Sequence, residues 1–125
     1  MLLDAAHRTL ASAVDLLWGI HLPREVQLGR RVRIWHSGCI FLNARAIGDD
    51  VHLRHGTTLG PLRGLGMDSA ELPVIEERVE LGAGVCVLGN VCIDHDSFVG
   101  ANSLVIKPVS ADSVVLGVPA RQVPR

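Results

Sequence analysis

The sequence contains very few aromatic residues, with two Phe, two Trp and no Tyr among its 125 residues. Hydrophobic residues still make up 48% of the chain, so its core must be built from Val, Leu, Ile and Ala. The 13 glycines argue against a helical bundle, because glycine destabilises the interior of a helix. At this length we expect one domain with a single core.

The sequence also lacks an excess of charge of either sign, since its formal net charge is −1. No basic region indicates binding to nucleic acid, and no polybasic run indicates a membrane surface. Charged residues interrupt the apolar N-terminal segment at Asp4, Arg8 and Asp15, so we do not expect a secretion signal or a transmembrane span there. The mean hydropathy of +0.32 suggests that other subunits cover some apolar surface.

Cysteine is scarce, and its three residues show no clustering of the kind that binds metal. They are Cys39, Cys86 and Cys92, an odd number that leaves one thiol over if two of them join. We interpret them as reduced thiols of a cytoplasmic protein.

The main positive feature of the sequence is a repeat with a period of six residues. This period is typical of short, flat strands that meet at corners, with each recurring aliphatic side chain pointing inward. Glycine or a polar residue follows many of the recurring positions, where a corner needs a permissive backbone. The recurring residues are Leu22, Leu28, Ile34, Ile47, Leu53, Leu59, Ile75, Leu81, Val87, Ile93, Val99 and Val105.

This repeat resembles the left-handed parallel β-helix of the hexapeptide-repeat transferases, in which three hexapeptides form one triangular coil. The left-handed sense comes from that resemblance alone, because general rules for parallel crossovers favour the right-handed form. The alternative is a β-sandwich in which the spacing arises by chance. We therefore predict an all-β fold, a left-handed parallel β-helix.

The segments outside the repeat define the expected organisation of the chain. Residues 1–20 should form a helix that caps the first coil, residues 21–109 the coils, and residues 110–125 a C-terminal tail. The helix is predicted from apolar residues at helical spacing, which are Leu3, Ala6, Leu10, Val14 and Leu17.

Two irregularities interrupt the coils. Thirteen steps separate Ile34 from Ile47, one more than two hexapeptides, so one corner should bulge near His36. Residues 61–73 contain Gly and Pro and lack the period, so they should form a loop pushed out of the coil. Regular solenoids insert loops where function lies, so we expect this loop to flank a site.

Several stretches narrow the resemblance to serine acetyltransferase and its polysaccharide O-acetyltransferase relatives, over roughly residues 19–123. The resemblance implies an acetyl-CoA-dependent O-acetyltransferase that acts on a hydroxyl acceptor. It also implies a homotrimer, with coenzyme A in a groove between subunits. The stretches are 34–38 (IWHSG), 50–60 (DVHLRHGTTLG), 81–90 (LGAGVCVLGN), 99–103 (VGANS) and 117–121 (GVPAR).

The resemblance implies catalytic histidines. His36 matches the family's general base, and an imidazole with a pKa of about 6.5 is neutral enough at pH 7 to take a proton from an alcohol. His55 follows one coil later, so it should stack on the same wall, where it could orient the acceptor, stabilise the oxyanion or simply face solvent. Family members carry an acid fifteen residues before the base; His21 stands there, and it can accept a hydrogen bond but brings no charge.

Two further departures from the family bear on the acceptor. Trp35 replaces the acid that commonly precedes the histidine in serine acetyltransferases. Those enzymes also place Arg-His before the proline that closes the loop, whereas this chain has Glu71 and Leu72 there. The lost cation argues against serine, whose carboxylate would bind it, and makes a sugar hydroxyl or another small alcohol at least as good a candidate.

The resemblance also implies donor-binding residues. Coenzyme A would lie against main-chain groups at corners that are rich in small residues, while Lys107 and Arg121 are candidates for its phosphates. The alternative is that the glycines serve corner geometry alone. The corner residues are Gly60, Gly82, Ala83, Gly84, Gly100 and Ala101.

Two other functions stay open. The chain could be a structural or regulatory protein that keeps the coil without the chemistry, as His21, Trp35 and Leu72 suggest. It could also be a zinc hydratase of the carbonic anhydrase type, which needs three histidines that converge on one ion. The histidines of this chain lack the long-then-short spacing of those enzymes, and we expect no metal.

Overall fold

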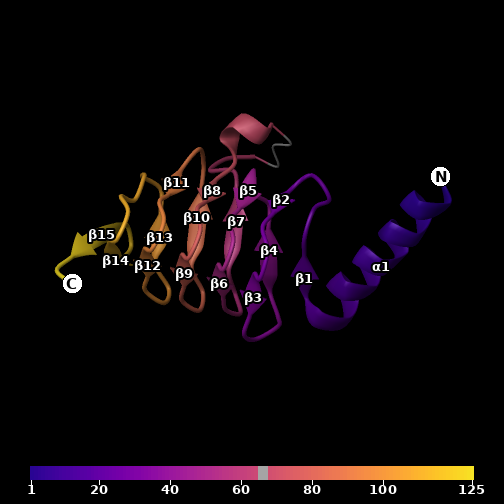
Figure 1. The fold of residues 1–125 in the computed structure, drawn as a ribbon, viewed down its shortest axis with the longest axis horizontal. Coiled ribbons are helices and arrows are strands. Elements are labelled where there is room, and N and C mark those ends of the chain that lie inside the picture. Colours follow the sequence, from indigo (N-terminus) through magenta and orange to yellow (C-terminus); the bar gives the residue numbers. More distant parts are fainter. Residues whose placement is uncertain (65–67) are drawn as a thin grey trace.

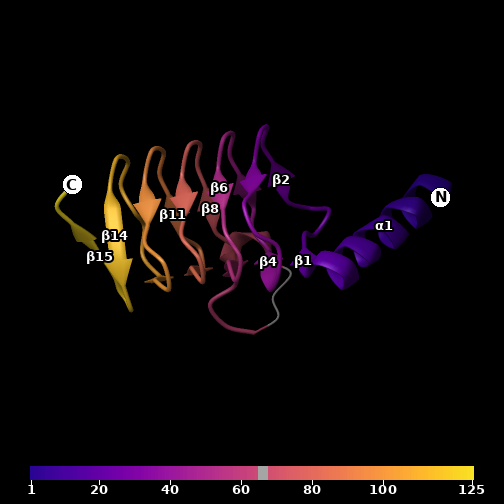
Figure 2. The ribbon, with the colours of Figure 1, turned by 90° about the horizontal axis from the view of Figure 1, so that it is seen from below.

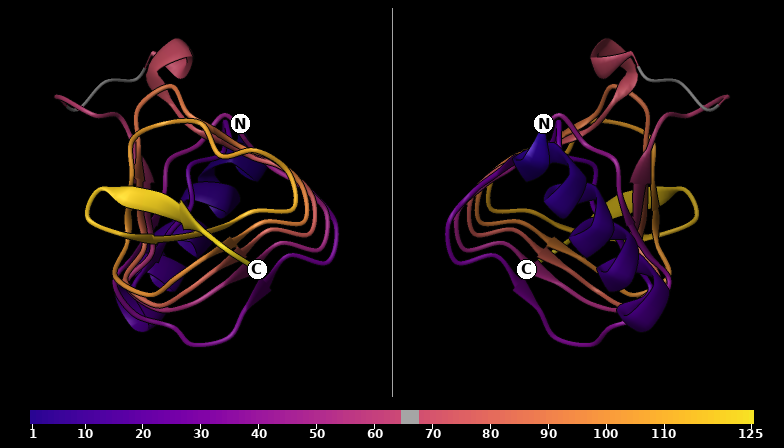
Figure 3. Two further views of the ribbon diagram at one scale, coloured as in Figure 1. Left: turned by 90° about the vertical axis from the view of Figure 1, so that its left-hand side faces the viewer. Right: turned by 90° about the vertical axis from the view of Figure 1, so that its right-hand side faces the viewer.

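The computed structural model describes residues 1–64 and 68–125. Its short strands stack into three walls, and within each wall the strands run parallel except for the last strand of the chain, β15 (Ala120–Val123). The chain winds through the walls as a left-handed β-helix with a triangular outline (Figure 3). The coils follow one another along the chain from the N-terminal helix to the C-terminus (Figure 1). The predicted fold is therefore confirmed.

Each wall collects one short strand from every coil. Wall A contains β1 (Ile20–His21), β4 (Ile40–Leu42), β7 (Thr58–Gly60), β10 (Cys86–Leu88) and β13 (Leu104–Val105). Wall B contains β2 (Gln27–Leu28), β5 (Ala46–Ile47), β8 (Val74–Ile75) and β11 (Cys92–Ile93). Wall C contains β3 (Arg33–Ile34), β6 (His52–Leu53), β9 (Glu80–Leu81), β12 (Phe98–Val99), β14 (Val114–Gly117) and β15 (Ala120–Val123).

The recurring aliphatic residues of the sequence build the core. In a strand, successive side chains point to opposite faces, so each short strand contributes one inward residue. Leu53 and Leu81 of wall C are fully buried, as is Leu59 of wall A. Equivalent residues of successive coils are paired in register, so the inward side chains stack in columns along the axis of the solenoid.

The bulge predicted near His36 lies at the corner between walls C and A, here called the C–A corner. Eight steps lead from Ile34 to Leu42, whereas six lead between their paired partners in the next coil, Leu53 and Leu59. The next stretch, from Leu42 to Ile47, has five steps, one fewer than a hexapeptide. The thirteen steps from Ile34 to Ile47 therefore exceed two hexapeptides by only one. Two extra residues therefore enlarge the corner that carries His36.

The parallel coils continue past Val109, where the sequence analysis placed the start of the tail. Val109 bridges to Ile93 of wall B, and β14 pairs in parallel with β12. Only four steps join Val105 to Val109, so the period of six breaks although the coil itself goes on. Val115 is buried in the core, and β15 then folds back antiparallel on β14 (Figure 2).

The segment predicted as a protruding loop connects β7 to β8 and contains a short 3₁₀ helix, Ser69–Glu71. The 3₁₀ helix projects from the corner between walls A and B (Figure 3). Asp68 begins it by accepting a hydrogen bond of 2.9 Å from the N–H of Ala70. Residues 65–67 of the predicted loop lie outside the described residues.

The helix α1 (Leu2–Trp18) ends at Gly19, which adopts a left-handed conformation with φ of 63°. Figure 1 shows the helix slanting away from the first coil. It covers that coil only in part, because the inward residues Leu28 and Ile34 remain 48% and 37% exposed. Within the described residues, no helix has the length and hydropathy needed to cross a membrane.

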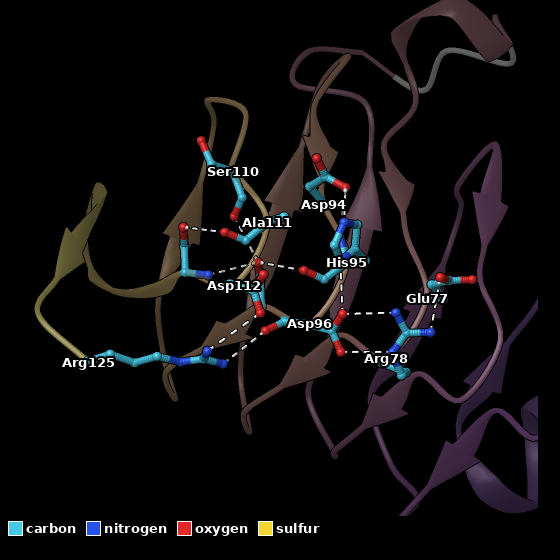
Figure 4. A network of polar contacts seen from close by, with 11 residues as sticks. Glu77, Arg78, Asp94, His95, Asp96, Ser110, Ala111, Asp112 and Arg125 are labelled. Carbon is cyan, nitrogen blue, oxygen red and sulfur yellow. Dashed lines mark hydrogen bonds and ion pairs between the residues drawn. The ribbon is translucent and has the colours of Figure 1, made fainter.

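A network of charged residues joins the corners between walls B and C (Figure 4). The turning residues there have left-handed backbones, with φ of 55° at Arg78 and 57° at Asp96, and their N–H groups bond to the preceding coil. The Arg78 guanidinium donates to both carboxylate oxygens of Asp96 at 2.8 and 2.9 Å. The Nδ1 of His95 lies 2.8 Å from the same carboxylate.

These contacts predict that stability falls on both sides of an intermediate pH. Hydrogen bonds from Arg78 and His95 hold the pKa of Asp96 well below its usual range, so this stabilisation is lost as the pH falls below about 4. The hydrogen bond to Asp96 raises the pKa of His95, so that stabilisation is lost as the pH rises above about 6.5. We expect Asp96→Asn to flatten both limbs of a plot of melting temperature against pH.

The matched control for this prediction is Asp50→Asn. Asp50 binds the guanidinium of Arg31 through two hydrogen bonds of 2.7 and 2.9 Å, and that contact lowers the pKa of Asp50. This variant should flatten the acidic limb and leave the alkaline limb in place. An alkaline limb that persists in Asp96→Asn would contradict the assignment to His95.

Candidate functional site

The candidate site follows the C–A corner of successive coils. Backbone hydrogen bonds connect these corners along the solenoid axis, from the N–H of Gly56 to the carbonyl of Gly38 at 3.0 Å and from Gly84 to His55 at 3.0 Å. The N–H of Asn102 continues the series to Ala83 at 2.8 Å. Two predicted histidines and most of the predicted donor-binding residues therefore lie in one column, which we call the corner column.

His36 and His55 come together in this column. Their ring centroids are 5.8 Å apart and their planes form an angle of 71°, which confirms the predicted proximity. Both side chains are exposed. The corner between His36 and β4 contains Gly38 with φ of 112° and Cys39 with φ of 53°, so the two extra residues are absorbed by left-handed turns. An acceptor can thus approach a pair of imidazoles from solvent.

His21 lies on the outer face of wall A and has different partners. Its Nδ1 is 3.0 Å from Oδ2 of Asp15, and its ring stacks on Phe41 with centroids 4.7 Å apart and planes 5° apart. The structure therefore groups His21 with Asp15, while the ring partner of His36 is His55. Asp15 of α1 thus places a carboxylate beside His21, but no hydrogen bond, ion pair or ring contact among the described residues joins either of them to His36.

Sequence reasoning missed Asp15 as a site residue. The predicted end of the helix near Gly19, directly before β1, could have indicated that Asp15 lies close to His21. The N–H of Gly19 bonds to the carbonyl of Asp15 at 2.9 Å, so the last helical turn stays close to the strand that begins at Ile20. Because β1 starts at once, the last turn of α1 and the outer face of wall A are neighbours.

Trp35 and Leu72, the two other departures from the family pattern, occupy different environments. Trp35 is half exposed and meets the ring of His52 edge-on, with centroids 5.8 Å apart. Leu72 is only 6% exposed, and its carbonyl accepts a hydrogen bond of 3.0 Å from Nε of Arg45. An apolar side chain is thus buried at the base of the loop, where the family carries a polar pair.

The predicted donor-binding glycines fall into two kinds. A Cβ on Gly82 would lie 2.6 Å from the backbone nitrogen of Ala101, so close stacking of the coils alone requires glycine there. Gly60 is different, because a Cβ there would meet no atom within 4 Å and its φ lies outside the left-handed region. Neither the turn nor the packing of the described residues requires glycine at position 60.

The two predicted phosphate-binding cations lie at the C-terminal end of the solenoid. Lys107 and Arg121 line one hollow of about 410 Å³ beside the last coil. Its walls include Pro108, Pro119 and Ala120. The structure therefore brings the two cations together, and it places them at the opposite end of the coils from His36. Among the described residues, no group of three or more His, Cys, Asp or Glu side chains is arranged to hold a metal ion.

Comparisons with known proteins show that the chain is similar to acetyltransferases. It is 40% identical to the serine acetyltransferase of Mycobacterium tuberculosis over 91% of this chain and 49% of that protein. It is 33% identical to the serine acetyltransferase of Helicobacter pylori strain J99 over 93% of this chain and 67% of that protein. It is 34% identical to WcaB of Escherichia coli, a proposed colanic acid biosynthesis acetyltransferase, over 86% of this chain and 65% of that protein.

A solved structure gives the same result at the level of the fold. A serine acetyltransferase in complex with CoA superposes with a TM-score of 0.84 at 27% identity, over 95% of this chain and 48% of that one. No family model matches the chain. The chain spans between about a third and two thirds of the length of the curated relatives that it matches.

Proposed function

This chain belongs to the serine acetyltransferase family of hexapeptide-repeat acyltransferases, and we propose that it transfers an acetyl group from acetyl-CoA to a hydroxyl group of a small molecule. The observation that carries the proposal is the exposed pair of His36 and His55 at the bulged corner. The pair begins the column of small residues that would hold the donor.

The reaction needs one base at this corner. His36 takes the proton of the acceptor hydroxyl while the oxygen attacks the thioester carbonyl, because an alcohol is weakly nucleophilic until its proton is removed. The tetrahedral intermediate then collapses, the carbon–sulfur bond breaks, and His36 returns the proton to the coenzyme A thiolate. His55 faces His36 closely enough to donate a hydrogen bond to the oxyanion of that intermediate.

The donor would run along the corner column toward the C-terminus. Small residues there let a pantetheine arm approach the main chain, and Gly82, Gly84 and Gly100 all belong to the column. Lys107 and Arg121 at the far end would bind the nucleotide phosphates, since charge-assisted hydrogen bonds to phosphate are strong. The proposal puts acetyl transfer at one end of the groove and nucleotide binding at the other.

A second copy of the chain would close this groove. Exposed apolar residues of the coils, such as Ile106 and Leu116, support assembly into a homotrimer, in which each groove lies between two subunits. The proposal also places the protein in the cytoplasm, where thiols such as Cys39, Cys86 and Cys92 stay reduced.

We expect Gly60→Ala and Gly82→Ala to have different effects. Gly60 ends β7, at the opposite edge of wall A from the corner column, so Gly60→Ala tests whether the donor also contacts that edge. It should leave the melting temperature unchanged and weaken coenzyme A binding by about tenfold, because the added methyl group meets no protein atom. Gly82→Ala should destabilise the fold by about 1–3 kcal/mol, because its methyl group overlaps the backbone of Ala101. Calorimetric titration with coenzyme A and thermal denaturation measure the two effects, and each variant is the control for the other. Full affinity in Gly60→Ala would contradict donor contact at Gly60.

The experiment that tests the function is a screen of hydroxyl acceptors with acetyl-CoA, followed by release of free thiol. Turnover with at least one acceptor supports the proposal. Binding of coenzyme A without turnover would favour an acyltransferase that lacks its acceptor in the screen. Failure to bind coenzyme A at millimolar concentration would favour the alternative, a structural or regulatory protein that keeps the coil.

A further inference from the structure

The outer face of wall A carries a groove across the first two coils. A hollow of about 670 Å³ lies toward the loop, between the β1–β2 turn and Ser69. A second hollow of about 410 Å³ lies toward the C–A corner, beside Asp15 and Cys39. His21 and Phe41 line both hollows, so the stacked pair forms the floor where the two meet. We call this surface the wall A groove.

The groove presents an aromatic floor in a chain that has almost no aromatic residues. The Phe41 side chain is 40% exposed although it is a large apolar ring. Its one described ring partner is the imidazole of His21, whose Nδ1 lies 3.0 Å from Oδ2 of Asp15. The stack with His21 therefore fixes the orientation of Phe41, and the rest of the ring remains open to a ligand.

The polar groups around this floor are mostly neutral. Gln27 and Asn43 offer amide donors and acceptors, and Ser69 offers a hydroxyl. Such groups hydrogen-bond well to hydroxyls of a ligand. The floor and the rim together fit a molecule with an apolar ring face and polar edges.

The charges of the groove disfavour an amino-acid carboxylate. Asp15 and Glu25 are both acidic, and the one cation among the described lining residues is Arg45. Arg45 directs Nε to the carbonyl of Leu72 at 3.0 Å and Nη2 to Asn90 at 2.8 Å, so its guanidinium is already engaged. A neutral ligand is the better electrostatic match.

We propose that the wall A groove binds a saccharide, whose ring stacks on Phe41 and whose hydroxyls bond to the neutral rim, as the acyl acceptor of the proposed transferase. The assignment rests on the proposed function and names its acceptor class. Cys39 lines one end of the groove and belongs to the same bulged corner as His36, so the proposal orients the saccharide with its reacting hydroxyl toward this end. The volumes of the two hollows match those of small-molecule sites, which are about 300–1,000 Å³.

The test measures saccharide binding without any acetyl donor. Methyl β-D-galactopyranoside, methyl β-D-glucopyranoside and methyl α-D-mannopyranoside are titrated into the full chain, with binding followed by saturation-transfer NMR. Phe41→Leu removes the platform and keeps an apolar side chain, and we expect it to weaken binding of at least one glycoside by about 3- to 10-fold. Phe98→Leu is the matched control, because Phe98 lies on wall C, and it should bind as the wild type does.

Kinetics with acetyl-CoA then separate this inference from the proposed function. Phe41→Leu should raise KM for the glycoside by a similar factor while kcat changes less. Absence of glycoside binding, equal binding by Phe41→Leu, or turnover with L-serine alone would overturn the saccharide assignment. Turnover with L-serine would leave the transferase proposal intact. Glycoside binding without any acetyl transfer would instead keep the site and reject the transferase.

Discussion

Replacing His36 with alanine is expected to lower kcat for acetyl transfer by about 10²- to 10⁴-fold, the contribution of a positioned general base. The side chain is exposed at an enlarged corner and is remote from the core, so its loss should not unfold the coils. Affinity for coenzyme A should change little, because the proposed donor site lies mainly along the small residues of the column. The measurement is thiol release at saturating acetyl-CoA and acceptor.

Two further variants make this result specific to His36. His55→Ala should reduce kcat by a smaller factor, since in the proposed mechanism the ring of His55 stabilises the oxyanion and does not take the proton. His7 is exposed on α1 and lines a hollow beside Ile20 and Leu22, outside the corner column, so His7→Ala should turn over at the wild-type rate. A His36→Ala protein that works at full rate would end the proposed mechanism, even with coenzyme A still bound.

The fold could be predicted from the sequence because each coil repeats the same inward position. Leu81 and Val99 were identified by a step of six alone, and both are fully buried. A parallel solenoid pairs each strand with its equivalent one coil later, so a fixed spacing in sequence becomes a fixed column in space. The period failed only where a corner changed length, as between Val105 and Val109.

The site was less accessible to sequence reasoning. The proximity of His36 and His55 followed from counting residues per coil, because both lie on the same corner. The contact of His21 with Asp15 did not, since it depends on the angle at which α1 leaves the first coil, and no repeat fixes that angle. The difference between Gly60 and Gly82 likewise could not be predicted, because the sequence does not show that a Cβ would clash with the next coil at Gly82 and meet no atom at Gly60.

The partial cover of the first coil gives the last prediction, which concerns stability. Leu81→Ala should cost about 2–5 kcal/mol in the free energy of unfolding, because it leaves a cavity in a column that neighbouring coils cannot close. Leu28→Ala removes the same atoms from an inward position of wall B, in the first coil. Its side chain is 48% exposed, since α1 slants away from it, so the cost should be about 1 kcal/mol or less.

Urea denaturation at one fixed protomer concentration measures both values, because assembly would otherwise add a concentration-dependent term. The contrast tests whether the N-terminal end of the solenoid, where Leu28 is half exposed, is open in solution. A Leu28→Ala protein as unstable as Leu81→Ala would mean that another surface, from α1 or from a second copy, covers the first coil. If that surface is α1, the helix would be a full cap, and Asp15 at its last turn would lie deeper beside His21.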